Sequence, residues 1–184
     1  TPNESLVESI RIEKEARNLL LANRFEEIER RAAQYRHTKA MYADGFWKLG
    51  SWYRGLGLVP RSSLDAQWTA RIKKLQAWIK QKPKSITAHI ALARAYHDGA
   101  YRARGGGWAD SVSDAQWKLM YTRLEQATSV LAKVKAQRTL CPGWYAAALR
   151  IAKLQNWDRA DFTGLANEGL RYFPQYHDFH YSMV

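Results

Sequence analysis

Apolar residues along this chain recur with the 3.6-residue period of α-helices rather than the two-residue period of strands. The clearest stripe is Trp68, Ile72, Leu75 and Ile79, which are spaced at i, i+4, i+7 and i+11. The most frequent residues, among them Ala, Leu, Lys, Arg, Gln and Glu, favour helices, and no segment alternates β-branched with polar residues. The pattern therefore predicts an all-α fold.

Capping and breaking residues place the limits of these helices. Ser5 with Glu8 and Ser113 with Gln116 have the spacing of capping boxes, and Ser85 is a further N-cap residue. We expect an aromatic helix from Phe46 that is stopped by glycines and a proline, a helix from Ser113 to about Arg138, and a turn after residue 141. The expected helices begin at Ser5, Phe25, Phe46, Ser63, Ser85, Ser113, Trp144, Asp158 and Tyr176, and the expected breaks lie at Asn23-Arg24, Asp44-Gly45, Gly55, Gly57, Pro60, Pro83, Gly105–Gly107, Pro142-Gly143, Asn156 and Pro174.

A repeat is visible in the C-terminal part of the chain. Pro142 and Pro174 are 32 residues apart and enclose two helices, which is close to the ~34-residue period of tetratricopeptide repeats. Each hairpin of such a repeat leaves an apolar flank that its neighbour covers. We expect tetratricopeptide-like helical hairpins, stacked as a short right-handed solenoid within one domain over residues 1–184. Because residues 40–62 and 99–112 interrupt the period, an irregular helical bundle is the alternative.

The composition is that of a globular protein, with 46% hydrophobic and 25% charged residues among 184. The net charge is +12, and residues 41–141 carry 17 basic but only 6 acidic side chains. This excess predicts a basic surface around the polar side of the helix that contains Lys73 and Lys80, suited to an acidic protein or peptide. A well-solvated surface without a partner is the alternative. No apolar run approaches the ~18 residues of a membrane span.

The segment from Arg102 to Asp110 is the most distinctive candidate site. Arg102 and Arg104 precede three glycines, Gly105 to Gly107, and Trp108 follows them. Free N–H groups at the start of the next helix, together with the arginines, favour an anion there. A structural loop closed by an ion pair between Arg104 and Asp110 is the competing interpretation.

Other candidate chemistry is weaker. His177 and His180 are at i and i+3, but a two-histidine pair without a third ligand is a poor metal site. His97-Asp98 suggests a general base, but no nucleophile motif accompanies it, and the single cysteine, Cys141, excludes an internal disulfide and a multi-cysteine zinc site. Aromatic residues beside basic ones, such as Trp47-Lys48, are more often core than a nucleic-acid surface. We therefore predict no catalytic residue, no metal and no cofactor.

Several motifs together resemble an uncharacterised bacterial family, domain of unknown function 4034. The most specific of them is the glycine-rich run from Arg102 to Ser113, followed by Trp117 and Arg123-Leu124. The others are Asp44-Gly45 with Trp47-Lys48-Leu49, Cys141-Pro142-Gly143-Trp144-Tyr145, and Gln155-Asn156-Trp157-Asp158-Arg159. The resemblance implies a bacterial source, a tetratricopeptide-like fold and a family domain that continues beyond Tyr181, so that this chain is shortened at its C-terminus. It implies no known activity.

The leading functional hypothesis is a non-catalytic protein–protein interaction module, because stacked hairpins form a concave surface for a peptide or helix. An enzyme or small-ligand binder that uses the Gly105–Gly107 loop is the first alternative, and nucleic-acid binding through a basic face is the second. A deep pocket with converging buried charge would favour the first alternative over an open groove. The oligomeric state and the compartment, cytoplasm or periplasm, stay open, since a chain that begins at Thr1 is compatible with a removed signal peptide.

Overall fold

The computed structural model describes residues 2–60 and 65–179. Helices make up 78% of it, and the described residues contain no strand beyond an isolated bridge between Met41 and Trp47. The all-α prediction is confirmed. The α-helices are α1 (Pro2–Leu21), α2 (Phe25–Thr38), α3 (Lys48–Gly57), α4 (Asp65–Gln81), α5 (Ile86–Arg104), α6 (Asp114–Ala132), α7 (Pro142–Leu154) and α8 (Arg159–Tyr172), and two 3-10 helices are η1 (Ala109–Ser111) and η2 (Lys135–Leu140).

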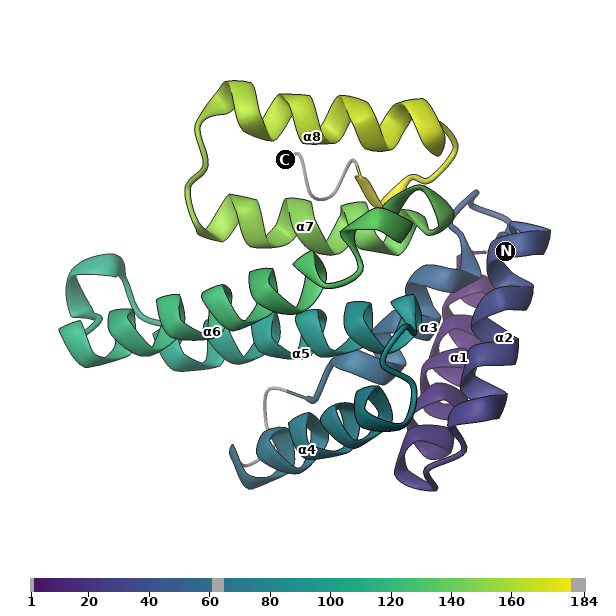
Figure 1. The fold of residues 1–184 in the computed structure, drawn as a ribbon, viewed down its shortest axis with the longest axis horizontal. Coiled ribbons are helices and arrows are strands. Elements are labelled where there is room, and N and C mark those ends of the chain that lie inside the picture. The colour runs from purple at the N-terminus through teal and green to yellow at the C-terminus, as the bar shows by residue number, and fades with distance from the viewer. Residues whose placement is uncertain (1, 61–64, 180–184) are drawn as a thin grey trace.

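The helices gather around α3 and α5 (Figure 1). Helices α1 and α2 form one antiparallel hairpin, α7 and α8 form another, and α5 and α6 form a long hairpin that extends away from the rest. Helix α3 contacts α1, α2, α5 and α7, and α5 contacts α3, α4, α6 and α7. This arrangement fits a helical bundle as well as a stack of hairpins, and the right-handed solenoid stays a prediction. None of the described helices is long and apolar enough to cross a membrane.

The predicted caps and turns are largely confirmed. The side chain of Ser85 accepts a hydrogen bond from the backbone N–H of Ala88, and Ser113 forms a complete capping box with Gln116. The tight turns after α1 and α7 contain Asn23 and Asn156 in the left-handed region, with φ of 55° and 53°. Asparagine tolerates this conformation better than most residues, which is why these turns are readable in the sequence.

Three predicted helix limits are wrong. Helix α1 begins at Pro2, so Ser5 does not cap it and instead lies buried one turn inside. The helix predicted to reach residue 138 ends at Ala132, because Val134 leaves helical dihedral angles and is buried. Pro142 and Gly143 are not a turn but the first residues of α7, where a proline needs no N–H partner. The start predicted at Ser63 and most of the helix predicted from Tyr176 lie outside the described residues.

Helix α3 ends at Gly57, before Pro60, as predicted, but it continues through Gly55. A Cβ on Gly55 would overlap the backbone carbonyl of Glu13 and lie 2.8 Å from the Cβ of Ala16, so α1 packs directly on the backbone of α3. A Cβ on Gly57 would lie 2.9 Å from the Cβ of Arg94 in α5. The absence of a side chain at these positions therefore lets two helices approach α3 closely, and this outweighs the low helix propensity of glycine.

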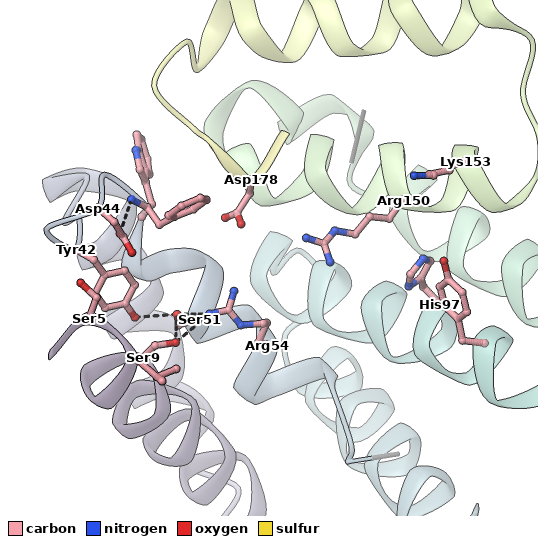
Figure 2. A pocket seen from close by; sticks show the side chains of 14 residues that line it. Ser5, Ser9, Tyr42, Asp44, Ser51, Arg54, His97, Arg150, Lys153 and Asp178 are labelled. Atoms are coloured by element: carbon pink, nitrogen blue, oxygen red, sulfur yellow. Dashed lines mark hydrogen bonds between the residues drawn. The ribbon is translucent and has the colours of Figure 1, made fainter. Parts of the chain in front are cut away.

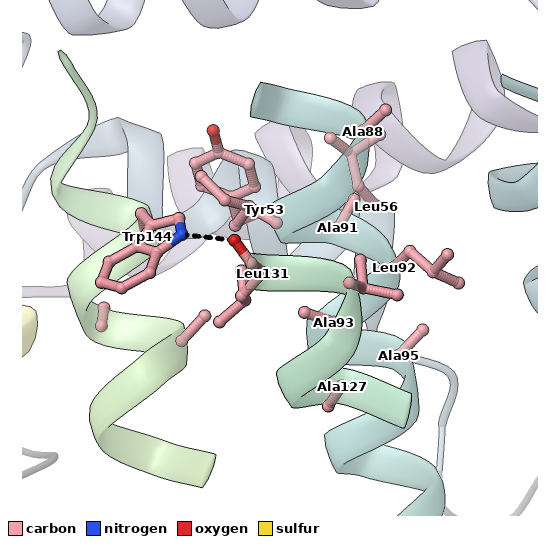
Figure 3. Close-up of a cluster of buried hydrophobic side chains, with 14 of the residues drawn as sticks. Tyr53, Leu56, Ala88, Ala91, Leu92, Ala93, Ala95, Ala127, Leu131 and Trp144 are labelled. Atoms are coloured by element: carbon pink, nitrogen blue, oxygen red, sulfur yellow. Dashed lines mark hydrogen bonds between the residues drawn. The ribbon is translucent and has the colours of Figure 1, made fainter. Parts of the chain in front are cut away.

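Alanine plays a similar part on α5 (Figure 3). The buried alanines of this helix let α3 and α6 pack against it, and Trp144 from α7 closes the cluster with a hydrogen bond of 3.1 Å from its Nε1 to the carbonyl of Leu131. Small side chains allow neighbouring backbones to come near, and the large rings then fill the remaining volume.

A buried arginine from another helix caps the C-terminal end of α3. The side chain of Arg71, on α4, is buried, and its Nη1 donates to the carbonyls of Gly55 and Leu56, at 2.9 and 2.8 Å. These are among the last carbonyls of α3, which have no partner within the helix, and a cation is favoured at that end of the helix dipole. Burial, and to a smaller extent the charge of Arg17, lowers the pKa of Arg71 to about 10, so the guanidinium stays charged at neutral pH.

The glycine contacts of α3 generate a test. We expect Gly55→Ala to destabilise the protein by roughly 1–3 kcal/mol in denaturant unfolding, because α1 must move away to admit the methyl group. Gly164→Ala is the matched control, since a Cβ on this exposed glycine of α8 would meet nothing within 4 Å. It should stabilise the protein by up to about 1 kcal/mol through helix propensity alone. Equal effects of the two substitutions would contradict the close approach at Gly55.

Candidate functional site

The glycine loop connects α5 to α6 at the far end of their hairpin, and its two arginines are engaged within the chain. Arg102 pairs with Asp98 at 3.1 Å and donates to the carbonyl of Val59 at 2.9 Å. Arg104 lies over the ring of Trp117, 5.5 Å from its centroid, and donates to the carbonyls of Gly105 and Gly107, at 3.3 and 3.2 Å.

These contacts favour the structural interpretation of the loop but not the expected ion pair. Among the described residues Arg104 has no ion pair with Asp110, because its guanidinium is turned toward the loop carbonyls. Gly105 adopts the left-handed φ of 76° that explains a glycine there, and Trp108 is 86% exposed. Binding of a ligand by this loop stays a prediction.

The other expected site residues lie elsewhere. Lys73 and Lys80 are exposed on α4, and no contact among the described residues joins them to the glycine loop. The basic surface around them stays a prediction. His177 packs edge-on against the ring of Phe46, 6.0 Å between centroids, while His180 lies outside the described residues. Within the described part of the chain, no three potential metal ligands come together.

A cavity that the sequence did not indicate lies between α1, α3, α5, α7 and the segment after α8 (Figure 2). Its volume is about 650 Å3, which is within the range of small-molecule and peptide-anchoring sites. Hydroxyl groups line the end beside α1, and basic side chains line the end beside α7 (Figure 2). The lining residues are Ser5, Leu6, Ser9, Tyr42, Asp44, Phe46, Trp47, Ser51, Arg54, His97, Tyr101, Arg150, Lys153 and Asp178.

The end of the cavity beside α1 is a closed hydrogen-bond network. Arg54 of α3 donates to Ser9 and Ser51 at 3.0 and 2.7 Å, and it forms an ion pair with Glu13 at 2.8 Å. The hydroxyl of Tyr42 donates to Ser51 at 2.8 Å. Since these partners already share the charge of Arg54, this end has little unsatisfied capacity for an anion.

The end beside α7 is different, because its cations lack partners. Arg150 and Lys153 are one turn apart on α7, and neither forms an ion pair with a described residue. The Nε of Arg150 is buried and has no hydrogen-bond partner. A buried donor without an acceptor costs about 1–3 kcal/mol, so an oxygen atom from a ligand would be stabilised here.

Two further charges lie close to this end. The side chain of Arg94 is 5% exposed, and burial, followed by the charge of Arg150, lowers its pKa to about 9. Asp178 is buried against the first turn of α3, where a Cβ on Gly50 would overlap its carboxylate. Its negative charge, with Tyr176, offsets part of the effect on Arg94. One buried carboxylate therefore faces three cations, and the local excess is positive.

The pKa of His97, on α5, is lowered in part by this excess of positive charge. Burial, and then the positive charges of Arg150 and Arg94, lowers its pKa to about 3, against a smaller opposing effect of a hydrogen bond to the backbone of Arg150. Its neighbour Asp98 does not compensate it, because that carboxylate pairs with Arg102. At neutral pH the imidazole is therefore neutral, and its single N–H already donates to the backbone of Arg150, so His97 adds neither positive charge nor a free donor to this end.

Sequence reasoning missed most of this site. It considered His97 only as a catalytic base, and it did not single out Arg54, Arg94, Arg150 or Asp178. The available signal was an arginine within an apolar helix, namely Arg94 among the alanines of α5 and Arg150 after Leu149. A charged residue in such a position is seldom buried without a partner, which marks it for attention.

The lowered pKa of His97 predicts acid sensitivity. The imidazole of the unfolded chain takes up a proton below about pH 6.5, whereas folded His97 takes it up only near pH 3. The stability supplied by neutral His97 is thus complete above pH 6.5 and is lost as the pH falls toward 3. The melting temperature of the wild-type protein should fall between pH 7 and pH 5, and we expect this decrease to be smaller in His97→Gln. In the control His37→Gln, on the exposed side of α2, the decrease should be the same as in wild type. If the melting temperatures of wild type and His97→Gln decrease by the same amount as the pH is lowered, the proposed role of His97 in acid sensitivity is contradicted.

Comparison with known proteins places the chain in a family without assigning an activity. The family model described as "Domain of unknown function (DUF4034)" matches residues 13–162, which include the basic end of the cavity on α5 and α7. No curated protein and no solved structure matches the chain. Because the match covers most of the sequence, the chain belongs to the DUF4034 family of domains of unknown function.

Proposed function

We propose that this domain is a non-catalytic interaction module that binds an acidic protein or peptide by taking one acidic group into the cavity. The observation that carries the proposal is the unpartnered, buried Nε of Arg150 at the basic end. Arg94 and Lys153 add positive charge there, and His97 stays neutral. Charge-assisted hydrogen bonds from an arginine to a carboxylate are about twice as strong as neutral ones.

The charge inside the cavity also favours an anion over other ligands. Arg150 and Lys153 line the basic end, Arg94 lies close behind it, and together they outnumber Asp178. Burial reduces the screening of Arg94 by water and salt, whereas Lys153 is exposed. An incoming carboxylate would therefore relieve repulsion among the cations as well as form new hydrogen bonds. The same charge should exclude cationic ligands.

A binding role is favoured over catalysis by the state of His97. A general base works best when its pKa is near the working pH, and a pKa of about 3 makes His97 a poor base at neutral pH. The cavity's serine hydroxyl groups are at the opposite end, where Arg54 and Tyr42 engage Ser9 and Ser51.

Binding of a small anion is the alternative that the cavity itself supports, in place of the Gly105–Gly107 loop suggested by the sequence. The arginines of the loop are bonded to carbonyls and to Asp98, whereas Arg150 retains a free donor. Nucleic-acid binding through the exposed basic side of α4 is a third hypothesis.

The proposal predicts a cavity-specific loss of affinity. We expect an acetylated tri-glutamate peptide to bind the wild-type protein in isothermal titration calorimetry, and Arg150→Gln to weaken it about tenfold, because one or two charge-assisted hydrogen bonds are lost. Arg159→Gln, on the exposed first turn of α8, is the control with the same net charge and should bind like wild type.

Three outcomes would contradict the proposal. An equal loss of peptide affinity in Arg150→Gln and Arg159→Gln would mean that only the overall charge of the protein determines binding. If the double variant Lys73→Glu with Lys80→Glu loses peptide affinity and Arg150→Gln does not, the acidic peptide binds on α4. Tighter binding of a single-stranded oligonucleotide than of the peptide, insensitive to Arg150→Gln, would favour nucleic-acid binding.

A further inference from the structure

The N-terminal half of α1 presents an unusual apolar face to solvent. Leu6, Val7 and Ile10 are 58%, 62% and 57% exposed. Leu6 and Ile10 are one turn apart, and Val7 lies three residues before Ile10, so the three side chains form one continuous stripe. Single exposed apolar residues are common, but three in two turns of one helix are typical of an interaction surface.

This stripe, defined by Leu6, Val7 and Ile10, is continuous with the cavity. Leu6 lines the cavity together with Ser5 and Ser9 of the same helix. Successive residues of a helix are about 100° apart, so the side of α1 changes from cavity wall at Ser9, through Leu6, to the exposed stripe at Ile10. A second hollow of about 290 Å3, lined in part by Val7, lies on the far side of the stripe.

The charges of the cavity fix how a ligand can lie across it. Asp44 lines the end beside α1, and Asp178 lies between the two ends, whereas Arg150 and Lys153 lie at the other end (Figure 2). An acidic group is repelled by the two carboxylates and attracted to the α7 end. The part of the ligand that reaches α1 therefore meets hydroxyls and then the apolar stripe.

We infer that the partner is an extended peptide segment that carries an acidic group and, a few residues away, bulky apolar side chains. The acidic group enters the α7 end of the cavity and the apolar side chains cover Leu6, Val7 and Ile10. This inference rests on the proposed function and adds to it the requirement for apolar residues in the partner. A small free anion satisfies only the basic end and leaves the stripe exposed.

The test uses two peptides and one double variant. The first peptide has two glutamates and two leucines separated by a spacer of two, four or six glycine and serine residues, and the second has the leucines replaced by serines. Wild-type protein should bind the best leucine peptide about tenfold or more tightly than its serine counterpart, because apolar area is buried on the stripe. Val7→Ser with Ile10→Ser, at two stripe positions outside the cavity lining, should remove this difference and leave the affinity for the serine peptide unchanged.

Both substituted side chains are more than half exposed, so the double variant should keep the wild-type melting temperature. The control is Leu140→Ser, on η2, whose side chain is 64% exposed and lies outside the cavity; it should bind both peptides like wild type.

The outcomes separate this inference from the proposed function. If the double variant keeps the preference for leucine while Arg150→Gln weakens both peptides, the inference fails and the proposed function stands. If Arg150→Gln weakens neither peptide, the proposed function itself fails. If sedimentation shows that wild type self-associates and the double variant does not, a second copy of the chain covers the stripe and the inference is overturned.

Discussion

The close approach of other segments to the backbone of α3 is the constraint on which the rest of the fold depends. At Gly55 the neighbour is α1, at Gly57 it is α5, and at Gly50 it is the carboxylate of Asp178. A side chain at any of these positions would displace a different part of the molecule. Packing interiors to crystal-like density makes such contacts specific, because a shift of one neighbour opens a void against another.

The same helix sets the geometry of the cavity. Arg54 projects from α3 into the end beside α1, and the segment that carries Asp178 is seated on the first turn of α3. Arg71 satisfies the last carbonyls of α3 from the side of α4, so both ends of this short helix are anchored by charge. With α3 packed between α1 and α7, the two walls of the cavity keep their spacing. The positive excess near Arg150 can then persist, because surrounding structure holds the cations in place.

Much of the fold could be predicted from local chemistry. The caps at Ser85 and Ser113 and the asparagine turns depend on residues within four positions of one another, and sequence reasoning finds such signals. The role of Gly55 could not be predicted, because the sequence does not distinguish a glycine that ends a helix from a glycine that lets a neighbouring helix pack closely. The burial of Arg71 could not be predicted for a related reason, since its partners are carbonyls of another helix. The candidate site was not predicted from the sequence because its residues come from four helices and two loops, and because Arg150 lies outside the region of high net charge.

Native-state hydrogen exchange of the α3 amides tests the central place of this helix most directly. If the fold depends on α3, the amides of the buried residues Trp52, Tyr53 and Leu56 should exchange only through global unfolding. Their free energy of exchange should then equal the free energy of unfolding measured with denaturant, while α8 opens at lower free energy. Exchange of these amides through local opening, with the α5 amides still protected, would show that the helices around α3 hold together without it.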